Sequence, residues 1–123
     1  METVWTMDVA GRLFENRDAG YSCRPDGTIP VDGYMVGVPR FGAVIPTSVV
    51  TSEEVLRLIE AYVTKLWGIA CRDGLYFGIW KDEGKIYLDM SERCNSRTFA
   101  VGVAQQRGEI AIYDVAGERE IRV

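Results

Sequence analysis

The residues in this chain that could do chemistry are grouped around Asp89, a carboxylate that interrupts a strand-like run. Ser91 and Glu92 follow it closely, and together these side chains could bind a hard cation or act in general acid–base catalysis. The same carboxylate could instead lie at the rim of a sheet, bonded to a backbone group or a tyrosine hydroxyl. We favour this structural interpretation. An enzyme centred on Asp89 and assisted by Glu92 or Asp114 is the alternative.

The residue counts argue against several other chemistries. The chain has no histidine, so it lacks the commonest general base and metal ligand and cannot build a Ser/His/Asp or Cys/His arrangement. Its three cysteines, Cys23, Cys71 and Cys94, are widely spaced and form no Cys-x-x-Cys motif. This spacing argues against a zinc site and against a disulfide framework. We therefore expect no metal, no cofactor and a reducing compartment.

A glycine-rich stretch from Gly33 to Gly42 comes nearest to a phosphate-binding loop. Its three glycines are four and five residues apart, and no Gly-Lys-Ser/Thr sequence follows them. The stretch therefore matches neither the P-loop nor the dinucleotide-binding pattern. Arg40 could meet an anion at this turn, although a mobile surface loop is the simpler interpretation.

A predicted hairpin and a third strand would position Asp89. Aromatic and β-branched residues dominate residues 75–81 and 85–90, and the Asp-Glu-Gly sequence between them suits a three-residue hairpin loop. Residues 109–114 alternate in the same way. Successive side chains on a strand point to opposite faces of its sheet. One face is therefore predicted to be an apolar core face, formed by Leu75, Phe77, Ile79, Ile86, Leu88, Met90, Ile110 and Ile112.

The opposite face of this predicted sheet is aromatic. Tyrosine and tryptophan have an apolar body and a polar tip, so such a face can be partly exposed to water and can act as a binding platform. A second layer formed by the N-terminal third of the chain is the more usual arrangement. The candidate binding residues are Tyr76, Trp80, Tyr87 and Tyr113, with Asp89 and Arg40 at the rim.

The clearest predicted helix begins at Thr51. Thr51 and Glu54 have the spacing of a capping box. Apolar residues then recur at helical intervals as far as Gly68, which is a suitable C-terminal stop. The apolar side of this helix is expected to pack on the core face of the sheet.

A second, weaker helix is predicted after the hairpin. Residues 91–95 form an expected polar link, and Asn95 or Ser96 would cap a helix that runs to about Gln106. Gly102 lowers the helix propensity by roughly 1 kcal/mol relative to alanine, so either close packing requires it or the helix is marginal. The expected apolar side consists of Phe99, Val103 and Ala104.

The remaining segments are less regular. Residues 4–9 alternate like a short strand, and a turn of helix could follow Gly11. Residues 29–38 resemble a strand interrupted by proline and glycine, which predicts an edge strand or a bulge. Residues 43–45 are expected to pair back as a hairpin arm, and residues 118–123 are expected to form a last short strand.

These elements predict a single α+β domain over residues 1–123. The sheet is expected to be mainly antiparallel and to carry two helices, with the elements in the order β-β-α-β-β-α-β-β. At this length the chain can bury a sizeable core without disulfides or a metal. The prediction places the aromatic face on the hairpin and the third strand.

Charge and hydropathy narrow the classes of partner. The net charge is −4 and the pI is about 4.8, and no basic groove is visible, so nucleic-acid binding is disfavoured. No apolar run approaches the ~18 residues that a membrane span needs, and the N-terminus lacks the pattern of a signal peptide. We expect a cytoplasmic protein without a membrane partner.

The C-terminal half also resembles a group of known sequences. Residues 76–81 and 85–89, followed by residues 108–114, are similar to small uncharacterised proteins of actinobacterial phages and mobile elements. The resemblance implies an accessory role in a phage or plasmid and transfers no activity.

The first hypothesis for function is a small non-catalytic interaction module that uses the aromatic face. Its partner would be another protein or a second copy of this chain, as in a homodimer. A component of a virion or of a larger complex is a further possibility. An enzyme or ligand-binding protein centred on Asp89 is the alternative.

Overall fold

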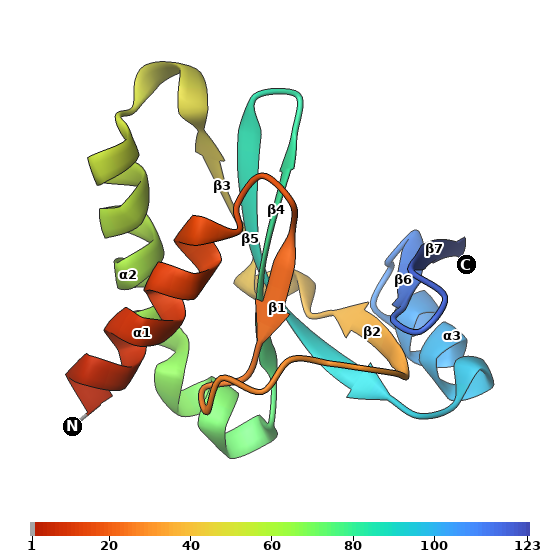
Figure 1. The fold of residues 1–123 in the computed structure, drawn as a ribbon. Helices are drawn as coiled ribbons and strands as arrows, with labels where there is room; N and C mark the ends of the chain where they lie inside the picture. The colour runs from red at the N-terminus through yellow and green to blue at the C-terminus, as the bar shows by residue number, and fades with distance from the viewer. Residues whose placement is uncertain (1) are drawn as a thin grey trace.

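A computed structural model of the protein describes residues 2–123 and has an α+β fold (Figure 1). The α-helices are α1 (Glu2–Glu15), α2 (Ser52–Asp73) and α3 (Arg97–Gln106). Two short 3-10 helices, η1 (Pro39–Phe41) and η2 (Thr47–Val49), lie on either side of strand β3. The strands are β1 (Tyr21–Cys23), β2 (Tyr34–Gly37), β3 (Ala43–Pro46), β4 (Tyr76–Asp82), β5 (Lys85–Cys94), β6 (Ala111–Asp114) and β7 (Arg119–Arg122).

The strands form one antiparallel sheet of seven strands in the order β1-β4-β5-β2-β6-β7, with β3 also paired to β5. The longest strand, β5, organises this sheet. One edge of β5 pairs with β4, while its other edge pairs first with β3, over residues 85–88, and then with β2, over residues 91–94. The expected α+β class, the antiparallel sheet and the central hairpin are therefore confirmed.

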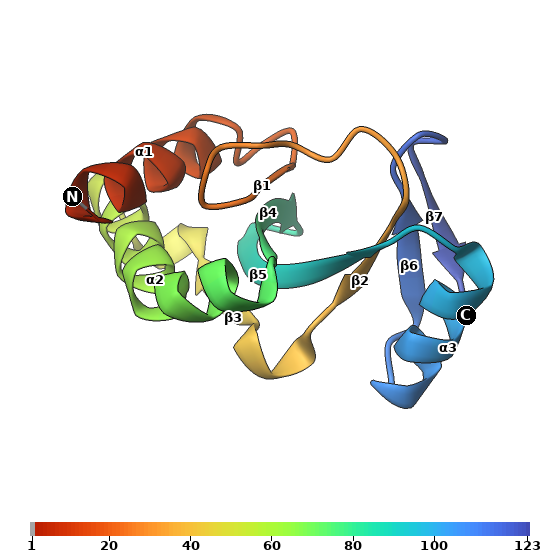
Figure 2. The ribbon, with the colours of Figure 1, turned by 90° about the horizontal axis from the view of Figure 1, so that it is seen from below.

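All three helices pack on the same face of the strand ladder. Below α1 and α2, a large hydrophobic cluster includes Phe77, Ile79 and Leu88, and below α3 a smaller cluster includes Val36 and Ile112. The strand register places all of these side chains on one face. The two groups of helices lie at opposite ends of the molecule (Figures 1 and 2), because α2 packs over β4 and β5 whereas α3 packs mainly over β2 and β6.

Helix α2 begins as its sequence predicts and ends later. The Thr51 side chain accepts a hydrogen bond from the Glu54 backbone N–H, which satisfies one of the free donors at the helix start. Gly68 lies inside the helix, and the stop is Gly74, whose φ of 65° is a left-handed conformation suited to glycine. Ala70, which is buried, lies in the additional turn.

The N-terminal third differs most from the prediction. The predicted strand over residues 4–9 is wrong, because these residues belong to α1, whose buried residues Val9, Ala10 and Leu13 are spaced for a helix packed on α2. The helix count is therefore three instead of two. Strand β2 is not an edge strand, since it lies between β5 and β6. The expected hairpin arm over residues 43–45 is strand β3, and its pairing partner is β5.

The region after the hairpin also needs two corrections. Residues 91–94 continue β5 and pair with β2, and Ser91 also pairs with Tyr76 of β4, so most of the predicted polar link is a strand. Helix α3 is capped by Ser96 as expected, since the Ser96 hydroxyl accepts a hydrogen bond from the Phe99 N–H. Phe99 itself is 61% exposed, and the side chains buried from this helix are Ala100 and Ala104. Ile110 is likewise exposed and does not belong to the core.

Candidate binding surface on the sheet

The sheet face opposite the helices carries a stacked aromatic pair. Trp80 in β4 and Tyr87 in β5 are direct cross-strand partners, and their rings are nearly parallel, with centroids 4.1 Å apart and an interplanar angle of 10°. The Tyr87 neighbour across the next strand pair is Val44 in β3. Trp80, Tyr87 and Val44 thus form one row across three strands, which we call the aromatic row.

The aromatic row is open to solvent and is held in place. Trp80 is 44% exposed and Val44 is 53% exposed. The indole Nε1–H of Trp80 donates a hydrogen bond of 3.0 Å to Oδ2 of Asp89, the next residue of β5 on the same face. The stack and this hydrogen bond together fix the orientation of the indole ring, so the exposed apolar surface of the row is preorganised.

Asp89 fits beside Trp80 because its cross-strand partner is a glycine. A Cβ atom added to Gly78 would lie closer than 3.0 Å to Oδ1 of Asp89, a separation that real Cβ atoms do not adopt. The carboxylate therefore occupies the space above the Gly78 backbone. A similar arrangement occurs at Gly37 in β2, where the carboxylate of Glu109 occupies the space that a Cβ atom would need.

The position of Asp89 changes its titration. Burial raises the pKa of the Asp89 carboxyl above its ordinary value, the hydrogen bond from Trp80 opposes this shift, and the negative charge of Glu109 adds to it. Asp89 therefore accepts the hydrogen bond that orients Trp80, and burial disfavours the ionised form of the Asp89 carboxyl. The enzyme hypothesis also calls for a raised pKa at Asp89. Burial of the carboxyl in the packed sheet is sufficient to raise it, so the raised pKa does not by itself support catalysis.

We expect the substitution Asp89→Asn to change how stability depends on pH. Because the folded pKa is raised, the folded protein binds more protons than the unfolded chain between the unfolded pKa and the folded pKa. Stability in the wild type therefore falls as the pH rises through that window. The asparagine side chain cannot ionise, so the variant should gain stability relative to the wild type on going from about pH 4 to about pH 7. Urea unfolding at both pH values measures this difference, and a difference that is the same at both would contradict the prediction.

The other predicted aromatic residues do not join the row. Tyr76 lies on the same face but is buried, with the guanidinium of Arg24 placed 5.6 Å from its ring centroid. Tyr113 in β6 is also on this face and is 44% exposed, but it lies far from the row. It pairs with Met35 of β2, and Met35 in turn pairs with Arg93 of β5. Arg93 is six residues along β5 from Tyr87, about 20 Å at roughly 3.3 Å per residue.

Arg40 is not at the rim of the aromatic face. It lies in η1 and lines a cavity on the helix side of the sheet together with Asp73, Glu92 and Arg107. Of the six residues predicted to form one surface, the structure therefore brings together Trp80, Tyr87 and Asp89. The sequence pattern held no sign of Val44 or Glu109, because Val44 reaches the row through the pairing of β3 with β5, and Glu109 lies over Gly37 of β2.

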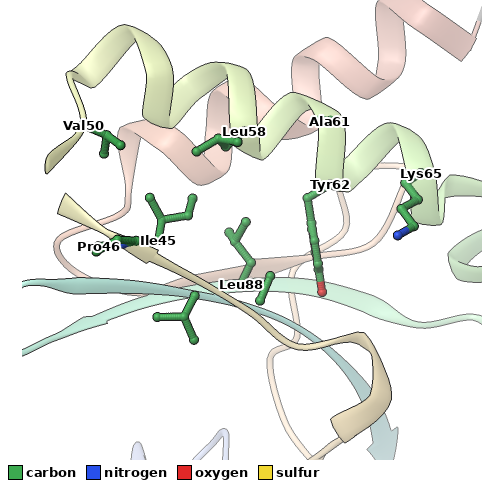
Figure 3. Close-up of a pocket in the computed structure, with 10 residues that line it drawn as sticks. Ile45, Pro46, Val50, Leu58, Ala61, Tyr62, Lys65 and Leu88 are labelled. Carbon is green, nitrogen blue, oxygen red and sulfur yellow. The ribbon is translucent and has the colours of Figure 1, made fainter.

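A second cavity, of about 290 Å³, is a mostly apolar groove between α2 and the edge strand β3 (Figure 3). Ile45 and Pro46 from β3 face Leu58 and Tyr62 from α2 across it, and Lys65 lies at one end. The Tyr62 hydroxyl donates a hydrogen bond to the Phe41 carbonyl oxygen. Neither of these two cavities is lined by Asp89, so neither is the concave pocket that catalysis by this carboxylate would need.

Comparison of the chain with protein-family models, with curated proteins and with solved structures found no match. Among the helices of residues 2–123, none combines the length and apolar character needed to cross a membrane. The fold and the aromatic row are therefore the basis for a functional proposal.

Proposed function

We propose that this protein is a small non-catalytic interaction module that binds through the aromatic row. The observation that carries the proposal is the exposed, stacked and hydrogen-bonded ring of Trp80 on a sheet face that no helix of the described chain covers. An accessory role in a phage or mobile element, implied by the resemblance of the C-terminal half, is compatible with such a module.

Fixed aromatic side chains are suited to protein binding. Tryptophan and tyrosine contribute large contact areas and are enriched among the residues that dominate binding energy. A ring that is already held in its bound orientation loses less conformational entropy on association. The stack with Tyr87 and the hydrogen bond to Asp89 supply this restraint before any partner arrives.

The partner that this surface favours is a second copy of the chain. Beside the aromatic row, Asp82 and Lys85 are cross-strand partners on the same face, and both are exposed. In a two-fold symmetric dimer the same patch meets itself, so a patch that carries one acidic and one basic residue can be self-complementary. Asp82 of one copy can then face Lys85 of the other while the apolar rows pack together.

Sedimentation equilibrium over a range of concentrations tests this proposal. We expect the wild type to form a dimer, and Trp80→Ala to raise the dimer dissociation constant by about 30-fold, the effect of losing ~2 kcal/mol at a binding hot spot. Tyr113→Ala is the matched control, because Tyr113 is an equally exposed aromatic residue on the same face outside the row. A wild type that stays monomeric throughout, or a folded Trp80→Ala variant with unchanged association, would overturn the proposal.

A further inference from the structure

A second candidate site lies on the helix side of the sheet, apart from the aromatic row. It is a cavity of about 250 Å³ between the large hydrophobic cluster below α1 and α2 and the smaller cluster below α3. Its charged lining residues are Arg40 from η1, Asp73 from the end of α2, Glu92 from β5 and Arg107 from the end of α3. We call it the two-arginine cavity.

Glu92 places a charge where the sheet pattern calls for an apolar residue. Its neighbours on the same face of β5, Met90 and Cys94, are both buried. Oε1 of Glu92 accepts a hydrogen bond of 2.6 Å from Nη2 of Arg107, whose Nη1 donates to the Gly37 carbonyl oxygen at 3.2 Å. A partly buried ion pair gains little stability over apolar packing, because both charges lose hydration. Its presence beside a cavity therefore suggests a role in binding.

Arg40 is the cation that is not neutralised at this cavity. Its guanidinium lies 4.8 Å from the ring centroid of Phe41, and among residues 2–123 it makes no ion pair within 4 Å. The Asp73 carboxylate, which also lines the cavity, is hydrogen-bonded to Arg72 through contacts of 2.9 and 3.2 Å. Since Glu92 is paired with Arg107 and Asp73 with Arg72, the charge of Arg40 is the one left without an ion pair among the charged residues that line the cavity.

We propose that the two-arginine cavity binds a small oxyanion, either a carboxylate or a phosphate group on a small molecule. Arg40 recognises the anion with its forked guanidinium, which matches the geometry of both groups. Arg107, whose charge is balanced by Glu92, is held in place by Glu92 and by the Gly37 carbonyl and offers further N–H donors. The volume suits a ligand smaller than a typical drug-sized molecule. Phe41 and Leu75, which also line the cavity, provide contact for its apolar part.

The direct test is a titration of the full chain with inorganic phosphate and, separately, with acetate, followed by NMR of the arginine side-chain N–H groups. We expect saturable shifts with at least one of the two anions, and about a tenfold loss of affinity in Arg40→Gln, since a hydrogen bond to a charged group is lost. The anion that binds more tightly identifies the ligand group.

Arg24→Gln is the matched control for Arg40→Gln. Arg24 also lies over an aromatic ring, that of Tyr76, but it does not line the cavity. Anion affinity should be unchanged in this variant. No saturation with either anion, or equal affinity in Arg40→Gln and the wild type, would overturn the proposal. Dimer formation is measured independently by sedimentation, so the two proposals can fail separately.

Discussion

Phe77→Ala is expected to destabilise the protein by about 3–5 kcal/mol, the usual cost of truncating a fully buried phenylalanine. Phe77 has no solvent exposure. Its ring packs against Trp67, with centroids 6.1 Å apart and nearly parallel planes, and edge-on against Tyr62 at 6.3 Å. This is where α2 meets β4, so the substitution removes the contacts that fasten the helix to the sheet. Urea unfolding measures the loss.

Phe99→Ala provides the control for this prediction. The two substitutions remove the same atoms, but Phe99 is 61% exposed on α3, so its loss should change stability by no more than about 0.5 kcal/mol. Similar losses at both positions would mean that the core is not centred on Phe77. A large loss at Phe99 alone would restore the sequence-based expectation that Phe99 faces the core.

Gly78→Ala is expected to cost about 1–3 kcal/mol, the range for forcing an additional methyl group into a packed site. The new Cβ atom would meet Oδ1 of Asp89 at less than 3.0 Å and would lie 3.4 Å from Oγ of Ser22. Asp89 has a short side chain, so it can move away only by giving up its hydrogen bond to Trp80. The variant should therefore lose stability and also the fixed orientation of the indole ring, which near-UV circular dichroism can follow.

Gly102→Ala is the matched control and should have the opposite sign. A Cβ atom at Gly102 meets nothing within 4 Å, and the residue lies within α3. Alanine should therefore stabilise the helix by roughly 0.5–1 kcal/mol. This also decides the question raised by the sequence, because close packing does not require glycine here. Equal losses in both variants would show that the space above Gly78 has no special role.

The parts of the fold that could be predicted from the sequence are those specified by local pattern. Alternation specified the hairpin of β4 and β5 and its two faces, and the capping box at Thr51 specified the start of α2. Helix α1 was missed because residues 4–9 alternate like a strand and Gly11 weakens helix propensity. Its helical form is supported by packing of Val9 and Leu13 against α2, a tertiary effect.

The composition of the candidate site was only partly predictable for the same reason. Trp80, Tyr87 and Asp89 lie on the two strands of one hairpin, so local alternation placed them together correctly. Tyr113 and Arg40 depend on long-range pairing, in which β2 inserts between β5 and β6. No short sequence pattern specifies such an insertion. The same long-range pairing brings Val44 beside Tyr87.

The most direct test of the proposed function is the accessibility of Trp80 as a function of protein concentration. A variant with Trp5→Phe and Trp67→Phe leaves Trp80 as the only tryptophan, and a variant with Trp5→Phe and Trp80→Phe leaves the buried Trp67 as a reference. Far-UV circular dichroism confirms that each variant is folded, and a neutral collisional quencher then probes the fluorescence. We predict that Trp80 is quenched far more readily than Trp67 at low concentration and becomes protected as the concentration rises. Quenching of Trp80 that does not change with concentration would contradict binding of a second copy through the aromatic row.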